Sequence, residues 1–169
     1  ETGLIGGERV RKNDPRVCLL GDLDEFNAAL GLASAHAGRF TGLDVLLRIQ
    51  KAVFSLGAEV ASPDERWRAE GLEALTSELE GQIDEWTEAL PPLTNFILPG
   101  GTLLSASLHL ARAVCRHAER SMVGLSLETE VRSEALVFMN RASDWLFCAA
   151  RAANSEAGVA DVPWSGESS

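Results

Sequence analysis

The sequence has few cysteines and no long hydrophobic run. Its three cysteines, Cys18, Cys115 and Cys148, are odd in number, form no CxxC pair and sit in apolar surroundings. We therefore expect reduced core thiols rather than disulfides or a cysteine metal site. No segment approaches the roughly 20 uninterrupted apolar residues that a spanning helix needs, and Glu1 to Lys12 lacks the apolar stretch of a signal peptide. These absences predict a cytoplasmic protein without a membrane partner.

Several catalytic and nucleotide-binding motifs are also missing. No GxxxxGK[ST] occurs, and no GxGxxG follows a strand pattern. The histidines His36, His109 and His117 show neither HExxH nor the ExxH pairs of di-iron helical bundles, so we predict no resident metal site. The formal net charge of −10 would repel phosphate-rich polymers, which argues against a nucleic-acid partner.

The composition is that of one globular domain over residues 1–169. Hydrophobic residues make up 46% of the 169 residues and charged residues 24%, which excludes a disordered chain. We divide the chain into a glycine-rich basic loop (1–21), a helical region (22–153) and a tail (154–169) with an isolated Trp164.

Apolar residues recur at helical spacing in five segments, and no strand pattern or internal repeat is present. The expected helices are Leu23 to His36, Leu43 to a stop at Ser62 and Pro63, Leu72 to Leu90, Thr102 to about Val123, and about Glu130 to Ala153. We expect Asp22 to cap the first helix and Thr102 the fourth. The pattern predicts an all-α fold, a helical bundle.

Arginines follow one face of the fourth predicted helix. Arg112, Arg116 and Arg120 are four residues apart, with Glu119 beside them. Three guanidinium groups in one row repel each other unless an anion joins them, so one interpretation is a site for an anionic ligand. The alternative is a surface row that acids on neighbouring helices neutralise.

Two other segments hold candidate binding residues. The loop Thr2 to Lys12 offers flexible backbone amides with Arg9 and Lys12, a composition that suits a triphosphate. Asn140 and Asp144 share a face of the fifth predicted helix in an apolar stretch, where they hold a ligand hydroxyl or an arginine in place, or else make a polar contact between helices. Asp24 on the first helix either caps it or orients an arginine.

The chain resembles the PduO-type ATP:cob(I)alamin adenosyltransferases in five segments that follow the family's order: TGLIGGERVRKNDPRV, GDLDEFNAALG, FILPGG, RAVCRHAER and NRASDWLF. The match spans nearly the whole chain. Other adenosyltransferase classes use a P-loop or a cysteine-rich metal motif, and neither occurs here. The family usually has a TxTG stretch just before the residue that matches Thr2, and this sequence begins after that point.

The resemblance implies a five-helix bundle that assembles as a homotrimer, with ATP bound between subunits. It implies nucleotide-binding roles for Thr2, Gly3, Arg9, Lys12, Arg112, Arg116, His117, Glu119, Arg120 and Asn140. Arginine is common at the position of His117, and a neutral imidazole would weaken one charge contact. Asp24 matches an acid that pairs with Arg112 or Arg116 across the interface, and Phe96 matches an aromatic residue against the lower face of the corrin.

The implied reaction moves the 5′-deoxyadenosyl group of ATP to cob(I)alamin and releases triphosphate. Cob(I)alamin is a strong nucleophile, so the protein has only to align cobalt with C5′. Mg²⁺ with Arg116, Arg120 and Lys12 would stabilise the leaving triphosphate. We expect Arg116, Asp24 and Phe96 to be the catalytic residues, with Phe96 excluding the lower axial ligand of cobalt and so easing its reduction.

Further partners and two rival functions follow from the same resemblance. A flavoprotein reductase would supply electrons, and an adenosylcobalamin-dependent enzyme would use the product. The first rival is a non-catalytic carrier or sensor of nucleotide or corrinoid with the same fold. The second is an interaction module whose arginine row docks an acidic partner, which predicts no affinity for ATP.

Overall fold

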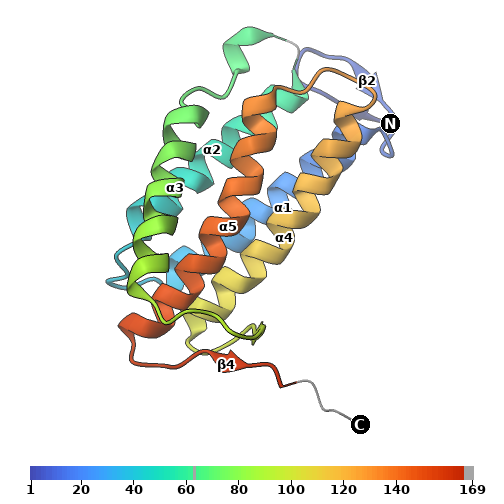
Figure 1. The fold of residues 1–169 in the computed structure, drawn as a ribbon. Helices are drawn as coiled ribbons and strands as arrows, with labels where there is room; N and C mark the ends of the chain where they lie inside the picture. The colour runs from blue at the N-terminus through green and yellow to red at the C-terminus, as the bar shows by residue number, and fades with distance from the viewer. Residues whose placement is uncertain (63, 166–169) are drawn as a thin grey trace.

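Five α-helices lie side by side in the structure, a computed structural model that describes residues 1–62 and 64–165 (Figure 1). They are α1 (Pro15–His36), α2 (Leu43–Ala61), α3 (Leu72–Ala89), α4 (Leu103–Ser126) and α5 (Ser133–Glu156), with a short 3-10 helix η1 (Glu65–Trp67) between α2 and α3. Helix α1 packs against α2 and α4, and α5 packs against α3 and α4. The predicted five-helix, all-α fold is confirmed.

One hydrophobic core runs through the bundle. The largest fully buried side chains include Phe26 of α1, Leu79 of α3, and Phe138 and Trp145 of α5. Each such side chain contributes roughly 1.5–3 kcal/mol when it leaves water. Helices α4 and α5 pack against each other in this core, and they carry half of the predicted site residues.

Helix α1 begins earlier than predicted. Pro15 occupies the first turn, where a missing N–H costs nothing, and the Asp14 side chain accepts a hydrogen bond from the Arg16 N–H at 2.9 Å. The prediction of Asp22 as the cap and of a loop to residue 21 is wrong, because Asp22 lies inside the helix. Thr102 is confirmed as the cap of α4, since its hydroxyl accepts from the Ser105 N–H at 3.0 Å.

The described residues contain four two-residue strands, which contradict the prediction that the chain has none. Strand β1 (Thr2–Gly3) pairs antiparallel with β2 (Arg9–Val10), and β3 (Ile97–Leu98) pairs antiparallel with β4 (Val162–Pro163). The register places Thr2 opposite Val10 and Ile97 opposite Pro163. Figure 1 shows β2 and β4 at opposite ends of the bundle.

Other boundaries are close to the predictions. Helix α2 ends at Ala61, before Ser62, and Pro63 lies outside the described residues, as do residues 166–169 of the tail. The helices α4 and α5 each extend about three residues further than predicted at their carboxyl ends. None of the helices in the described ranges is long and apolar enough to cross a membrane.

The three cysteines are free, and only part of the prediction about them holds. Cys115 is buried and Cys148 is half-buried. Burial raises the pKa of both thiols, so they are inert at neutral pH. Cys18 was expected in the core but is exposed, because it lies in the first turns of α1 that the sequence placed in a loop.

Candidate functional site

A cavity of about 980 Å³ opens at the end of the bundle that carries β3 and β4. The segment Leu93–Ile97 forms one wall, Arg112 of α4 and part of α5 form another, and the tail contributes Trp164 and Ser165. Phe96 is 82% exposed in this wall, which is unusual for a phenylalanine. The space has the size of a small-molecule site and a mixed apolar and charged lining.

Charged side chains of the cavity are held in fixed contacts. Arg141 forms ion pairs with Asp144 at 3.1 Å and with Glu80 of α3 at 3.6 Å. The Arg112 guanidinium lies 5.3 Å from the centre of the Phe147 ring, a cation–π contact. Asp144 thus holds Arg141 of its own helix in place rather than contacting another helix directly.

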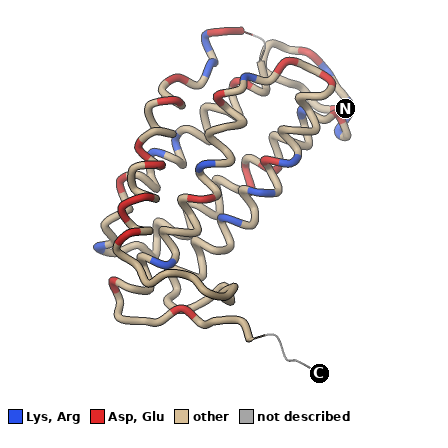
Figure 2. The backbone as a smooth tube through the Cα atoms, viewed as in Figure 1, with Lys and Arg blue, Asp and Glu red and all other residues tan. Residues whose placement is uncertain are grey.

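The arginine row on α4 has no acidic partner in the described part of the chain. No ion pair within 4.0 Å involves Arg112, Arg116 or Arg120, although seven other arginines form them. Figure 2 shows basic positions recurring along α4. The Arg120 side chain donates to the Arg116 carbonyl at 2.9 Å, and Asn140 of α5 donates to the Glu119 carboxylate at 2.9 Å. Within one chain the row is therefore not neutralised, which favours an anionic ligand.

The glycine-rich segment is a hairpin at the other end of the bundle. Its turn uses Gly6 and Gly7 at φ values of +97° and +88°, which side chains rarely adopt. Arg11 and Lys12 follow it and are exposed, while Arg9 pairs with Glu1 at 3.3 Å. Helix α4 is about 36 Å long at 1.5 Å per residue. A single chain therefore does not bring Thr2, Gly3 and Lys12 to the cavity at Phe96.

Asp24 lies on a different face from the arginine row. It lines a second hollow of about 340 Å³ between α1 and α2, together with Phe54 and Trp67. Asp24 is exposed and forms no ion pair within the described residues. It is not a cap, because α1 starts nine residues before it. The predicted pairing of Asp24 with an arginine of a neighbouring subunit stays a prediction.

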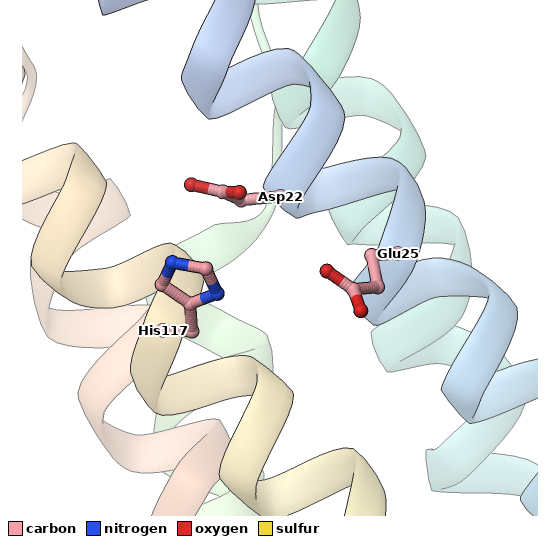
Figure 3. Close-up of side chains that lie close together, drawn as sticks. All are labelled: Asp22, Glu25 and His117. Atoms are coloured by element: carbon pink, nitrogen blue, oxygen red, sulfur yellow. The ribbon is translucent and has the colours of Figure 1, made fainter.

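His117 faces two acids of α1. Figure 3 shows Asp22 and Glu25 pointing toward the imidazole across the α1–α4 contact. The ligand atoms of the three side chains all lie within 4.8 Å of one another. A one-helix motif search misses this group because the ligands come from helices far apart in sequence. An arginine at this position would meet the same two carboxylates.

Several residues of the cavity were not identified from the sequence. Arg141, Phe147 and Cys148 look like ordinary helix residues, and only folding places them beside the Leu93–Ile97 segment. Trp164 is visible in the sequence as a lone large aromatic side chain in a polar tail, and such a side chain usually has a contact to make. The two-residue strands β3 and β4 show no helical period that a sequence pattern could reveal.

Comparison with known proteins gives a consistent result. A family model described as cobalamin adenosyltransferase matches residues 1–153. The chain is 39% identical over 168 residues to the corrinoid adenosyltransferase of Bacillus subtilis, covering 97% of this chain and 86% of that protein. It is 40% identical to the corrinoid adenosyltransferase PduO of Salmonella typhimurium, covering 95% of this chain and 49% of that longer protein.

A solved structure shows the same fold. It is a variant PduO-type ATP:corrinoid adenosyltransferase from Lactobacillus reuteri in complex with cobalamin and ATP. The two chains superpose with a TM-score of 0.90 at 38% sequence identity, over 98% of this chain and 91% of that one.

Proposed function

The chain belongs to the cobalamin adenosyltransferase family, and from this premise we propose how its residues transfer the 5′-deoxyadenosyl group of ATP to the cobalt of reduced cobalamin. The protein is a corrinoid adenosyltransferase, and ATP and cobalamin are its substrates. In the reaction the Co–C5′ bond forms from the electron pair of Co(I), the C5′–O bond breaks, and triphosphate leaves with that bond's electrons.

The unpaired arginine row carries the proposal for the nucleotide site. Arg112 lines the cavity, and Arg116 and Arg120 continue from it along α4 for about 12 Å. A row of cations that starts at an open cavity suits a substrate with an uncharged adenosine and a polyanionic tail. Guanidinium groups bind phosphate oxygens in pairs of hydrogen bonds and stabilise the leaving triphosphate.

Asn140 and Glu119 form the second part of this site. Their hydrogen bond at 2.9 Å joins α5 to α4 next to the arginine row. We propose that Glu119 and Asn140 bind the nucleoside, because amide and carboxylate groups suit hydroxyl and amine partners. His117 lies beside the carboxylates of Asp22 and Glu25, which repel phosphate, so its contribution to phosphate binding is smaller than that of Arg116 or Arg120.

Phe96 is proposed to face the lower side of the corrin. A phenyl ring that is 82% exposed in a cavity wall is available to pack against a flat apolar ligand. It supplies no ligand atom to cobalt and leaves no room there for water or the lower base. Cob(II)alamin without a lower ligand accepts an electron more readily, so Phe96 acts on reduction.

We propose that the active site lies between subunits of a homotrimer. The hairpin with Thr2, Gly3, Arg9 and Lys12 lies at the opposite end of the bundle from the cavity. Asp24 and the arginine row form no ion pairs within the described residues. Apolar side chains are exposed on two faces, Phe54 of α2 at 73% and Leu110 of α4 at 51%. Such patches mark protein contacts, and two different faces close a ring.

The remaining components follow from the chemistry. ATP would enter as its Mg²⁺ complex, which lowers the charge that Arg116, Arg120 and Lys12 have to offset. An upstream flavoprotein reductase would supply one electron to Co(II), and an adenosylcobalamin-dependent enzyme would consume the product. ATP and a reducing pool both belong to the cytoplasm, which we propose as the compartment.

The first test is anaerobic. Chemically reduced cob(I)alamin is mixed with the protein and MgATP, and the visible spectrum is followed for adenosylcobalamin. We expect Arg116→Ala to lower kcat/KM for ATP about 10- to 100-fold, the effect of losing charge-assisted hydrogen bonds worth about 1.5–3 kcal/mol. Asn140→Ala should lower it about 10-fold.

A matched control separates the site from general damage. Arg48 lies on α2 and pairs with Glu78 of α3, away from α4, so Arg48→Ala should leave kcat/KM within about two-fold. ATP binding with no turnover in the wild type would instead identify a carrier or sensor. Equal losses in the Arg48 and Arg116 variants would remove the nucleotide role of the row.

A further inference from the structure

A buried ion pair joins the tail to the end of α5. The Arg151 side chain is 8% exposed, and its Nε donates to Asp161 Oδ2 at 2.8 Å. Its Nη2 donates to the Pro91 carbonyl at 2.7 Å. One arginine therefore fixes both the tail and the start of the segment that leads to Phe96. Removing one partner of such an ion pair is strongly destabilising, because the other partner is left as an unpaired charge away from water.

Asn154 connects the same tail to the start of α4. It is 2% exposed, and its Oδ1 accepts from the Thr102 N–H at 3.0 Å. Its Nδ2 lies 3.2 Å from both the Gly100 carbonyl and Asp161 Oδ1 and donates to each. The segment between Pro91 and Thr102 is thus held at both ends by one turn of α5, and Asp161 is the shared acceptor.

The tail then reaches the cavity wall directly. Strand β4 pairs with β3, and the Trp164 N–H donates to the Phe96 carbonyl at 2.7 Å. Trp164 also lines the cavity beside Phe96. Since the Phe96 side chain is 82% exposed, its own packing does not set its direction. The backbone of residues 96–98 has to set it, and that backbone is paired with the anchored tail.

We propose that Arg151 and Asp161 are positioning residues of the adenosyltransferase reaction, which hold Phe96 in the corrin cavity through the β3–β4 ribbon. This inference rests on the role proposed above for Phe96. Neither residue touches the reacting atoms. They act because a ribbon released from Asp161 lets the Phe96 backbone move, and the ring then no longer excludes the lower ligand of cobalt.

The test separates reduction from transfer. Cob(I)alamin already lacks a lower ligand, whereas cob(II)alamin has to lose it before it takes up an electron. We expect Asp161→Asn to lower turnover from cob(II)alamin with a coupled reductant about 10-fold or more, and turnover from preformed cob(I)alamin about three-fold or less. The visible spectrum of cob(II)alamin bound with MgATP should shift toward the base-on form.

Three comparisons make the result specific. Phe96→Ala sets the size of the effect, and the double variant Asp161→Asn with Phe96→Ala should be no worse than Phe96→Ala alone, because the two changes act on one step. Cobinamide, which lacks the lower base, should restore turnover in Asp161→Asn. Glu59→Gln breaks a similar ion pair, Arg132–Glu59 at 2.8 Å, at the other end of α5 and should leave the ratio of the two turnover rates unchanged.

A second pair of variants covers the case in which Asp161→Asn does not fold. Trp164→Pro removes the N–H that binds the Phe96 carbonyl, and Trp164→Ala keeps it, while both lie outside the bundle core. We expect the proline variant to show the larger loss with cob(II)alamin. Equal losses with cob(I)alamin and cob(II)alamin, or additive effects with Phe96→Ala, would overturn the inference. No turnover in the wild type would overturn the proposed function instead.

Discussion

Burial decides which titratable groups near the cavity carry charge. Desolvation lowers the pKa of His109, and the nearby Arg112 lowers it further, while Asp161 opposes the shift. Burial raises the pKa of the Cys148 thiol. At neutral pH both groups are therefore uncharged. Neither a Cys148 thiolate nor a His109 imidazolium is therefore available to the cavity at this pH.

The His109 environment predicts a pH effect on stability. A buried histidine with a lowered folded-state pKa binds a proton more readily when unfolded, so the free energy of unfolding falls as pH drops below about 6.5. Each unit between the two pKa values costs about 1.4 kcal/mol. We expect urea unfolding between pH 7.5 and 5 to show this loss in the wild type and a flatter profile in His109→Gln.

Acids contribute in a different window. Burial would raise the pKa of Glu59, but its hydrogen bonds from Arg132 and Ala69 outweigh burial, and the pKa lies below 4.5. The stability from this group is present above about pH 4.5 and is lost as pH falls through the folded-state pKa. A loss between pH 7 and 5 that persists unchanged in His109→Gln would contradict the role of His109.

At the scale of elements, the turn before α4 depends on one glycine. Gly101 has φ of +99°, and an added Cβ would meet the Asn154 side chain. Gly101→Ala should cost about 2 kcal/mol or more, from left-handed strain and from displaced Asn154 hydrogen bonds. For a domain of this size the Tm should fall by about 4–8 °C in calorimetry.

Gly100→Ala is the control for this change. Its added Cβ would have nothing within 4 Å, and its φ lies outside the left-handed region. The Gly100 carbonyl, which accepts from Ser105 and Asn154, stays in place. We expect its Tm to stay within about 2 °C of the wild type. A similar fall in both variants would show that the segment tolerates no side chain at all, and would remove the special role of Gly101.

The elements also show what a sequence pattern can and cannot reveal. Apolar periodicity located all five helices, because each buries one face in a common core. It missed the first two turns of α1, where Pro15 and Arg16 read as loop although Asp14 caps the helix. It also missed β3 and β4, because Ile97 and Pro163 are held by pairing across 66 residues rather than by a local period.

The candidate site was predictable to the same extent. The arginine row was visible because four-residue spacing guarantees a shared helix face. The cavity was not, because it joins residues from the 93–97 segment, α4, α5 and the tail. The anchor at Arg151 was hidden for the same reason: its partners Pro91 and Asp161 lie on segments whose packing no spacing rule describes.

On the scale of the whole molecule, charge is divided between faces. Every charged side chain of α3 is acidic, whereas basic positions recur along α4 (Figure 2). A chain with a net charge of −10 would repel ATP as a whole, so a local basic row has to provide the attraction. The row lies beside the cavity, and α5 packs between α4 and the acidic helix α3.

The positions of Asp24 and the arginine row on different faces of the chain predict complementation between subunits. If Asp24 of one subunit and the arginine row of its neighbour build one site, Asp24→Ala and Arg116→Ala each disable every site in a pure trimer. In randomly mixed trimers about a quarter of the interfaces join an intact Asp24 face to an intact Arg116 face. We therefore expect unfolding and refolding of an equimolar mixture to recover about a quarter of wild-type adenosylcobalamin formation. Sites built within one chain would recover none, because every chain in the mixture carries one of the two changes.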